Sequence, residues 1–386
     1  MEMNKYSFYK IFFVLIILTS CFLPIIHSNG YIIHETNCNI NWMDDWLYRA
    51  DIEITSTHDS TLVNYTLRIE LTNLFNYSLA KTNGGDIRFT DHNDAQLPFW
   101  IEKWNENGNS TIWVLIPIIE PDTSYRIFMY YGNLFTLSIG RGDQVFRYFD
   151  DFENQGLGEE PEGWHIKQRE WGSFEINSNS RIGDSSCYYI DNSTAGSCRF
   201  YKKFSENIIE KNLEFWIKPK YLSDSGILCY NDNNNSYIGG STYFGHDTSV
   251  ISHYDGSYHS LLSPFQAENW YFFSIQLVSI NSYNQIIYDE NGTLLVSANN
   301  LPYLGNPSKI DYFMNGGNTL STMAFYIDAI RYRDYVSNEP IIEITDYQQI
   351  KSTNILPIFS GTFEILAIVV IGFLGATYLI KKTKKE

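Results

Sequence analysis

The sequence predicts an all-β protein in which two antiparallel β-sandwich domains, both jelly-roll-like, lie between an N-terminal signal segment and one C-terminal transmembrane helix. Aromatic residues make up 16% of the 386 residues and charged residues only 18%, a composition typical of extracellular β modules. Apolar and polar residues alternate in many short segments separated by turn residues. The expected parts are a signal peptide (1–30), a first sandwich (31–136), a linker (137–145), a second sandwich (146–335), a stalk (336–356), a transmembrane helix (357–380) and a cytoplasmic tail (381–386).

The N-terminal segment has the layout of a secretory signal peptide. Lys5 and Lys10 precede the apolar residues 11–26, and small or polar residues follow. We expect cleavage near Ser28. Cys21 ends a Leu-Thr-Ser-Cys run similar to a lipoprotein acceptor box, but the apolar run continues beyond it, so an unmodified cysteine is the preferred interpretation and lipidation the alternative.

The C-terminal segment predicts a membrane anchor. Residues 365–380 carry no charge, and with the residues before them they are long enough, at about 1.5 Å per residue, to cross about 30 Å of hydrocarbon. Four lysines in the tail 381–386 indicate its cytoplasmic location. We therefore expect a single-pass protein of the cell membrane with its N-terminal domains outside.

The formal net charge of −17 argues against nucleic acid and anionic lipid as partners. The external part also carries glycosylation acceptors, since Asn-x-Ser/Thr begins at Asn64, Asn76, Asn109, Asn192, Asn234 and Asn291. An oxidising exterior permits disulfides. Cys187 and Cys198 flank a hairpin-like segment and could bond to each other, although two buried thiols explain them equally well.

The first external region reads as a sandwich of short strands. Val63, Tyr65 and Leu67 alternate with polar residues, so one strand face is apolar. Further strands are expected at 86–90, 98–103, 111–117 and 124–131, separated by Asn-, Asp- and Gly-rich turns. We expect Trp46, Trp100 and Trp113 to fill the core. The simplest interpretation of Asp86 and Arg88 is a solvated or edge pair of little weight in stability.

Five short motifs in this region occur in a fixed order. They are Trp46-Leu47-Tyr48-Arg49, Asp86-Ile87-Arg88-Phe89, 97–102 (Leu-Pro-Phe-Trp-Ile-Glu), Trp113-Val114 and Tyr130-Tyr131-Gly132-Asn133. Over 46–133 the chain resembles the domain-of-unknown-function family 2341, a β-sandwich common in archaeal and bacterial surface proteins. That resemblance implies a prokaryotic surface protein and brings no established activity.

Two glycines and mixed charge in 140–143 predict a flexible joint between the domains. The second region is again β-rich: Leu213, Phe215 and Ile217 alternate with Glu214, Trp216 and Lys218, and Asn291-Gly292 predicts a hairpin turn. Beyond it, 338–344 could add an edge strand before the stalk.

Three loose motifs in the second region carry another resemblance. Phe149-Asp150-Asp151-Phe152-Glu153, Asn269-Trp270-Tyr271 and 326–330 (Tyr-Ile-Asp-Ala-Ile) are similar to the concanavalin A-like lectin/glucanase superfamily, including laminin-G-like modules. The resemblance implies a jelly roll that in many relatives binds glycan or protein, sometimes through calcium. The Glu-x-Asp-x-x-Glu strand of its glucanase branch, which places the two carboxylates that glycoside hydrolysis needs, is absent.

Few other residues point to chemistry. His246, His253 and His259 with Asp247 and Asp255 fit no coordination spacing, so we interpret them as solvated loop residues. Asp150, Asp151 and Asp328 are hard oxygen ligands near the two ends of the second domain. Aspartates that cap turns and accept backbone hydrogen bonds are the preferred interpretation, and calcium is the alternative cofactor to test there. A ligand-binding surface is expected around a set of tyrosines among Gly, Asn and Ser: Tyr230, Tyr237, Tyr243, Tyr254 and Tyr258.

The sequence therefore predicts a membrane-anchored, non-enzymatic surface protein that recognises a glycan or another surface protein. The alternatives are a carbohydrate-active hydrolase of the glucanase type, whose carboxylates meet only in the folded chain, and a purely architectural component of the cell envelope.

Overall fold

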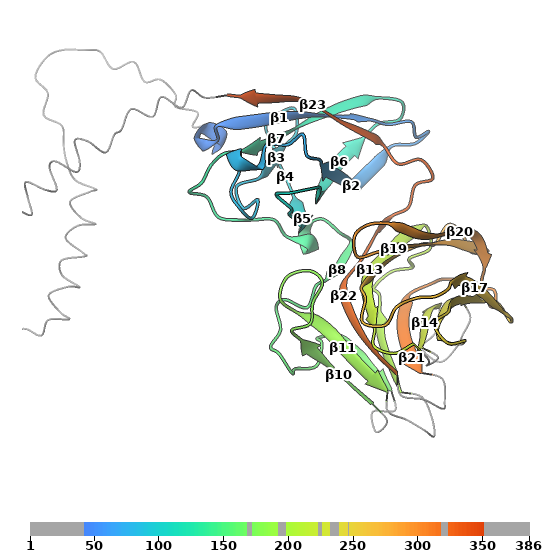
Figure 1. The fold of residues 1–386 in the computed structure, drawn as a ribbon. Coiled ribbons are helices and arrows are strands. Elements are labelled where there is room, and N and C mark those ends of the chain that lie inside the picture. The colour runs from blue at the N-terminus through green and yellow to red at the C-terminus, as the bar shows by residue number, and fades with distance from the viewer. Residues whose placement is uncertain are drawn as a thin grey trace, which may run out of the picture. The chain divides into compact units, whose positions relative to one another are not determined.

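The computed structural model describes residues 42–167, 172–191, 198–222, 226–231, 239–245, 247–317 and 323–350. These residues form β-strands and three short 3-10 helices, so the predicted all-β sandwich architecture is confirmed (Figure 1). Among them, no helix is long and apolar enough to span a bilayer. The expected signal peptide 1–30 and transmembrane helix 357–380 lie outside the described residues.

The first sandwich consists of a five-stranded and a three-stranded sheet. The five-stranded sheet has the order β23-β1-β7-β3-β4, with strands Ile341–Gln349, Tyr48–Thr55, Ser124–Tyr131, Arg88–Thr90 and Gln96–Leu97. The three-stranded sheet has the order β2-β6-β5, with strands Leu62–Leu71, Ser110–Ile119 and Phe99–Lys103. The inner faces of both sheets contribute to one hydrophobic core.

The last strand of the chain belongs to this first sandwich. β23 pairs antiparallel with β1 from Tyr48↔Gln349 to Thr55↔Ile341, and the amide of Ile350 donates to the carbonyl of Leu47. The stalk expected over 336–356 therefore does not begin where we placed it. Ile342 and Ile344 pack against the first core, which keeps this segment on the sheet.

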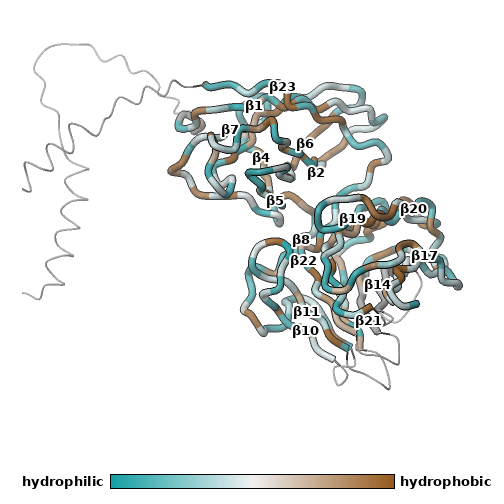
Figure 2. Tube along the Cα trace, in the orientation of Figure 1, coloured by the Kyte–Doolittle hydropathy of each residue, from teal (hydrophilic) through white to brown (hydrophobic). Residues whose placement is uncertain are grey.

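The β2 strand follows the predicted alternation except at its start. Tyr65, Leu67 and Ile69 are buried, but Val63 is 55% exposed. Asn64 adopts a positive φ of 51° and lies between the Val63↔Ile118 and Tyr65↔Ile116 pairs, opposite Pro117 and without a shift in register. This non-extended backbone at Asn64 interrupts the regular alternation, and Val63 on its N-terminal side is exposed. Figure 2 shows polar and apolar residues interleaved along the strands of both sandwiches.

The second sandwich packs an eight-stranded sheet against a seven-stranded sheet. The eight-stranded sheet has the order β10-β11-β22-β13-β18-β19-β20, with β8 also paired to β22; its strands are Gly172–Asn177, Ser186–Asp191, Met323–Asp334, Lys211–Pro219, Tyr271–Gln276, Ser282–Asp289, Leu294–Pro302 and Tyr148–Asp150. The seven-stranded sheet has the order β17-β16-β15-β14-β21-β12-β9, with strands Tyr258–Leu262, Ile251–Tyr254, Gly239–Phe244, Gly226–Asn231, Tyr312–Gly317, Arg199–Lys203 and His165–Lys167.

The β19–β20 hairpin is confirmed. Asp289 donates its amide to the carbonyl of Thr293, and Gly292 has the positive φ, 88°, that its turn position requires.

Of the two alternatives for Cys187 and Cys198, the structure has the buried thiols, which are not joined by a disulfide. The strands on either side of the segment between them, β11 and β12, do not pair with each other. Cys187 lies on β11 of the eight-stranded sheet, whereas Cys198 directly precedes β12 of the seven-stranded sheet. Burial strongly raises the pKa of Cys187, so its thiol stays protonated and unreactive.

The expected flexible joint is packed. The amide of Arg141 donates to the carbonyl of Phe99, and the short helix η3 (Gly142–Gln144) follows. Gly142 is buried, and a Cβ there would lie 2.3 Å from the ring of Phe149. The side chain of Thr66 donates to the carbonyl of Val145, so the connection is held on both sides.

Candidate functional site

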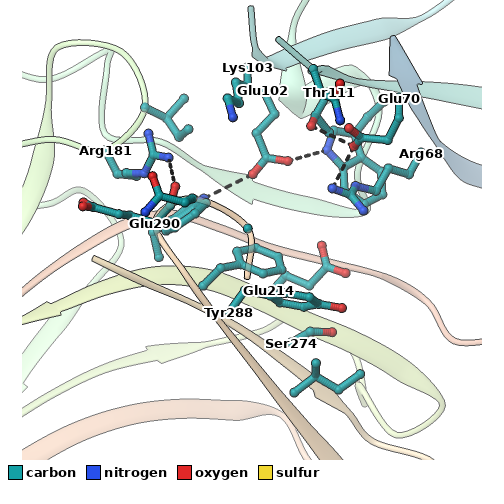
Figure 3. A pocket seen from close by; sticks show the side chains of 18 of the residues that line it. Arg68, Glu70, Glu102, Lys103, Thr111, Arg181, Glu214, Ser274, Tyr288 and Glu290 are labelled. Carbon is teal, nitrogen blue, oxygen red and sulfur yellow. Dashed lines mark hydrogen bonds and ion pairs between the residues drawn. The ribbon is translucent and has the colours of Figure 1, made fainter. Parts of the chain in front are cut away.

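The outer face of the eight-stranded sheet forms one wall of a pocket of about 430 Å³ (Figure 3). Trp216 comes from β13, Phe272 from β18 and Tyr288 from β19. These residues lie on the face opposite the core, because the residues next to them in sequence, Phe215, Phe273 and Ile287, are fully buried in the second hydrophobic core. Three aromatic side chains therefore lie on the outer face of neighbouring strands, where Phe272 and Tyr288 are half-buried and Trp216 is 8% exposed.

The first sandwich supplies the other wall. Glu102 and Lys103 come from β5, Thr111 and Trp113 from β6, and Arg68 from β2. The loop before β11 adds Arg181, whose guanidinium carbon lies 4.4 Å from the ring centre of Trp216. Polar groups at the site also come from three amides: Asn109, Gln276 and Asn291.

An ion network underlies this site. The guanidinium of Arg331 on β22 donates to Glu102 at 2.9 Å and to Glu214 at 3.0 Å. Arg333 donates to Glu214 at 3.1 Å and to Glu339 at 2.7 Å. Arg331 is fully buried, with its guanidinium carbon 5.1 Å from the ring centre of Trp113.

The carboxylate of Glu102 is held in its ionised form. Burial by itself would raise its pKa, but the Arg331 charge and hydrogen bonds from the indole N–H groups of Trp113 (2.7 Å) and Trp216 (3.2 Å) outweigh burial and lower it. Glu102 therefore has no proton to give near neutral pH. Chemically, the site offers aromatic faces and fixed hydrogen-bonding groups around this carboxylate.

Trp100 and Trp113 are buried, as expected for core residues, but not in the sandwich core. They belong to a separate aromatic cluster with Phe146, Trp216 and Trp270. Trp46 is also buried, and its indole N–H donates to the carbonyl of Asp86.

The predicted tyrosine surface lies elsewhere, on the seven-stranded sheet. Three of its members form a cluster with ring centres 4.7 to 5.3 Å apart: Tyr243, Tyr254 and Tyr258. Tyr243 is buried and Tyr258 is 37% exposed, so the cluster offers little ring surface. The side chains of Tyr230 and Tyr237 are outside the described part of the chain.

The expected calcium ligands do not converge as a set of three. The Asp150 carboxylate already accepts hydrogen bonds from the indole of Trp164, the hydroxyl of Tyr148 and the amide of Phe152. Within the described residues, no three His, Cys, Asp or Glu side chains are placed to hold a metal ion.

Asp328 has more capacity for a cation. Its Oδ2 accepts the amides of Arg181 and Ile182, while its buried Oδ1 has no hydrogen-bond partner. Burial, with a smaller contribution from the charge of Asp151, raises the pKa of Asp328 to about 7. A cation beside Oδ1 would fit this orphaned oxygen, and Asp151, whose charge acts on Asp328, is a second carboxylate in the surroundings.

The histidines are not all solvated loop residues as we interpreted them. His253 on β16 is buried, its Nδ1 lies 2.8 Å from the hydroxyl of Tyr283, and it pairs across the strands with His259. The ring of His259 lies 3.0 Å from Asp255. His246 lies outside the described residues.

Four of the six glycosylation acceptors are described, and all four are exposed: Asn64, Asn76, Asn109 and Asn291. Asn109 and Asn291 lie on opposite walls of the pocket. Asn192 and Asn234 are outside the described residues.

The pocket was not anticipated from sequence, although one signal pointed to it. In the alternation along β13, Trp216 shares a face with Glu214 and Lys218. An indole on the nominally polar face of a strand requires a partner surface, and Phe272 and Tyr288 occupy the same face of β18 and β19. The other wall could not be read from sequence, because its residues come from a different sheet.

The family model "Domain of unknown function (DUF2341)" matches residues 83–167, which confirms the resemblance over part of the first sandwich and the start of the second. A search of curated proteins found no match.

Several solved structures have a similar backbone arrangement. A sialidase aligns at 11% identity over 56% of this chain and 20% of its own, with a TM-score of 0.39. An endo-beta-1,4-glucuronan lyase from the fungus Trichoderma reesei aligns at 10% identity over 50% of this chain and 98% of its own, with a TM-score of 0.36. The carbohydrate binding module CBM66 from Bacillus subtilis aligns at 12% identity over 45% of this chain and 96% of its own, with a TM-score of 0.31. This chain thus spans about a fifth of the sialidase, and its one family match is to a domain without an assigned function.

Proposed function

We propose that this chain is a membrane-anchored surface protein whose second sandwich, a concanavalin A-like jelly roll, binds a neutral glycan in the pocket beside Trp216, Phe272 and Tyr288. The observation that carries the proposal is the row of three outward-facing rings within reach of fixed polar groups. The proposed architecture and cellular location of the protein are those predicted from the sequence: an archaeal or bacterial protein with a signal peptide and a single membrane anchor over 357–380.

The pocket suits a sugar in size and chemistry. A volume of about 430 Å³ is in the range of small-ligand sites, which are commonly about 300 to 1,000 Å³. Pyranose rings present apolar faces that stack on aromatic side chains, and their hydroxyls need hydrogen-bonding groups at the edges. Tyr288 supplies a half-buried ring, while Gln276 and Asn291 supply amides.

Binding is favoured over hydrolysis by the state of the carboxylates. Glycoside hydrolysis requires one carboxylic acid that is protonated near neutral pH and a second carboxylate beside the bond to be cleaved. Glu102 and Glu214 both contact Arg331, and the pKa of Glu102 is lowered. Asp328, whose pKa is raised, does not line the pocket.

The pairing of charges also supports a neutral ligand. Arg68 contacts Glu70 at 2.7 Å, Arg333 contacts Glu214 and Glu339, and Arg181 donates to the carbonyl of Glu290. An acidic sugar would have to break one of these contacts to gain an arginine, and Lys103 is the other cation of the lining.

The test is a glycan array probed with the purified full-length chain in detergent, followed by a check of each bound glycan for cleavage products. We expect binding of neutral glycans without cleavage. Cleavage of a bound glycan would favour the hydrolase alternative. Absence of binding across the array, with the protein folded, would favour the architectural role or a protein ligand.

A further inference from the structure

The loop that follows β7 carries four exposed apolar side chains, including the most exposed one of the first sandwich, Phe135. Four residues of the segment 134–139, here called the apolar loop, are exposed: Leu134 (61%), Phe135 (97%), Leu137 (77%) and Ile139 (44%). A contiguous exposed apolar segment on an extracellular domain indicates contact with a partner or a membrane.

The apolar loop is held by buried polar side chains. Arg88 is 3% exposed, and its guanidinium donates to the hydroxyl of Thr136 at 3.0 Å and to the carbonyl of Leu137 at 2.6 Å. Lys81 donates to the carbonyl of Thr136 at 2.7 Å. Because the loop backbone is fixed by these bonds, the exposure of Phe135 and Leu137 is a feature of the folded domain.

The start of the loop is fixed as well. The carboxylate of Asp86, which is fully buried, accepts the amide of Gly132 at 2.7 Å. Gly132 has a positive φ of 90°, and a Cβ there would lie 2.6 Å from the ring of Tyr48. Any other residue at 132 would be strained and would clash.

The apolar loop lies at the end of the first sandwich from which the chain continues to its C-terminal segment. Tyr131, just before the loop, pairs with Tyr48, and Tyr48 pairs with Gln349 on its other side. Ile350, the last described residue, donates its amide to Leu47. In Figure 1 the starting end of β1 and the finishing end of β23 lie together at this edge.

We infer that the apolar loop inserts into the interface of the membrane that holds the anchor. This inference rests on the proposed anchor over 357–380. Only residues 351–356 separate Ile350 from that segment, and six residues reach at most about 20 Å when fully extended. The loop is thereby confined near the bilayer surface, where phenylalanine and leucine side chains can enter the headgroup boundary.

The membrane contact is apolar rather than electrostatic. The net charge of −17 disfavours adsorption to anionic lipid, so the expected surface is zwitterionic. Insertion of Phe135 and Leu137 would fix the first sandwich next to the bilayer. The same sandwich supplies one wall of the pocket through its strands β2, β5 and β6.

The test uses the full-length chain reconstituted into phosphatidylcholine vesicles whose acyl chains are brominated near the headgroup. Phe135→Trp and Leu137→Trp place a quenchable indole on the apolar loop. Ile118→Trp is the matched control: Ile118 is a 50% exposed aliphatic residue near the end of β6, at the opposite end of the sandwich, where β1 finishes beside β7 at Thr55↔Ser124.

We expect the two loop variants to lose more fluorescence in brominated than in ordinary vesicles, relative to the unmodified chain, while Ile118→Trp shows no added loss. Vesicle flotation of the same samples reports the anchor independently. A chain that floats but whose loop and control variants are quenched equally overturns the inference and leaves the anchor standing. A chain that does not float refutes the anchor and the loop insertion together.

Discussion

Glu102 and Arg331 are 229 positions apart in the sequence, and Oε1 of the glutamate accepts a 2.9 Å hydrogen bond from the arginine. Arg331 is fully buried, and the Glu102 side chain is 8% exposed. This contact joins β5 of the first sandwich to β22 of the second. It underlies the pocket, one wall of which carries the aromatic residues.

We expect Arg331→Met to destabilise the chain by about 3 to 5 kcal/mol, because Glu102 and Glu214 would remain buried without their cation. Denaturant unfolding of the detergent-solubilised chain measures the change, and a cycle with Glu102→Gln isolates the pair. Arg68→Met is the control: its partner Glu70 is 36% exposed, so the loss should be below about 1 kcal/mol. Equal losses for both variants would contradict the assigned role of Arg331.

If a glycan is identified, Tyr288→Ala should weaken its binding by about tenfold or more, the usual effect of removing an aromatic anchor. Tyr258→Ala, in the exposed part of the tyrosine cluster on the seven-stranded sheet, should leave the affinity unchanged. Isothermal titration with both variants measures the difference. The opposite result would return the binding surface to the tyrosines that the sequence suggested.

Replacement of Arg88 by methionine should release the apolar loop and cost about 2 to 4 kcal/mol, because the carbonyls of Gly85, Ile87 and Leu137 would lose their buried donor. Limited proteolysis should then cut within 132–141. Arg126→Met serves as the comparison, since its 54% exposed side chain lies 3.8 Å from Asp51 and contributes little. An intact loop in the Arg88 variant would mean that the clamp is not needed.

The stability of the folded chain should depend on Asp328 between about pH 4 and pH 7. Its pKa rises from 3.8 to about 7 on folding, so the folded state binds the proton more tightly. The resulting stabilisation is complete below pH 4 and is lost as the pH rises through 7, by up to about 4 kcal/mol. Asp328→Asn should therefore be more stable than the unmodified chain at pH 8 and similar at pH 4, as measured by denaturant midpoints. Asp184→Asn, which removes a carboxylate from the exposed surface, is the matched control.

Calcium binding at Asp328 stays a prediction, and the unfolding midpoint of the chain tests it. A bound cation would replace the proton of Asp328, so added Ca²⁺ should raise the unfolding midpoint at pH 8 and flatten its pH dependence. Asp328→Asn and Asp151→Asn should each abolish the calcium effect. A midpoint insensitive to Ca²⁺ at pH 8 would remove calcium from this site.

The sequence was enough to predict the β-sandwich class, since period-two patterns and turn residues are local properties. The strand β7 (Ser124–Tyr131) and the Asn291-Gly292 turn were predicted closely for this reason. The motif around Asp86 and Arg88 was found, but its role was misjudged: both residues are buried and hold the backbone of a loop. Arg88 donates to backbone carbonyls and Asp86 accepts backbone amides, and these backbone partners leave no trace in the side-chain sequence.

Only the tertiary structure decided which distant segments meet. In it, β23 pairs with β1, Cys187 and Cys198 lie on or beside strands of different sheets, and Glu102 contacts Arg331. Alternation says which face of a strand is apolar, but not which strand or sheet lies against that face, because pairing depends on the whole folded chain. Local sequence patterns were therefore sufficient to predict the fold class, whereas the pocket and the fixed position of the apolar loop depend on long-range contacts.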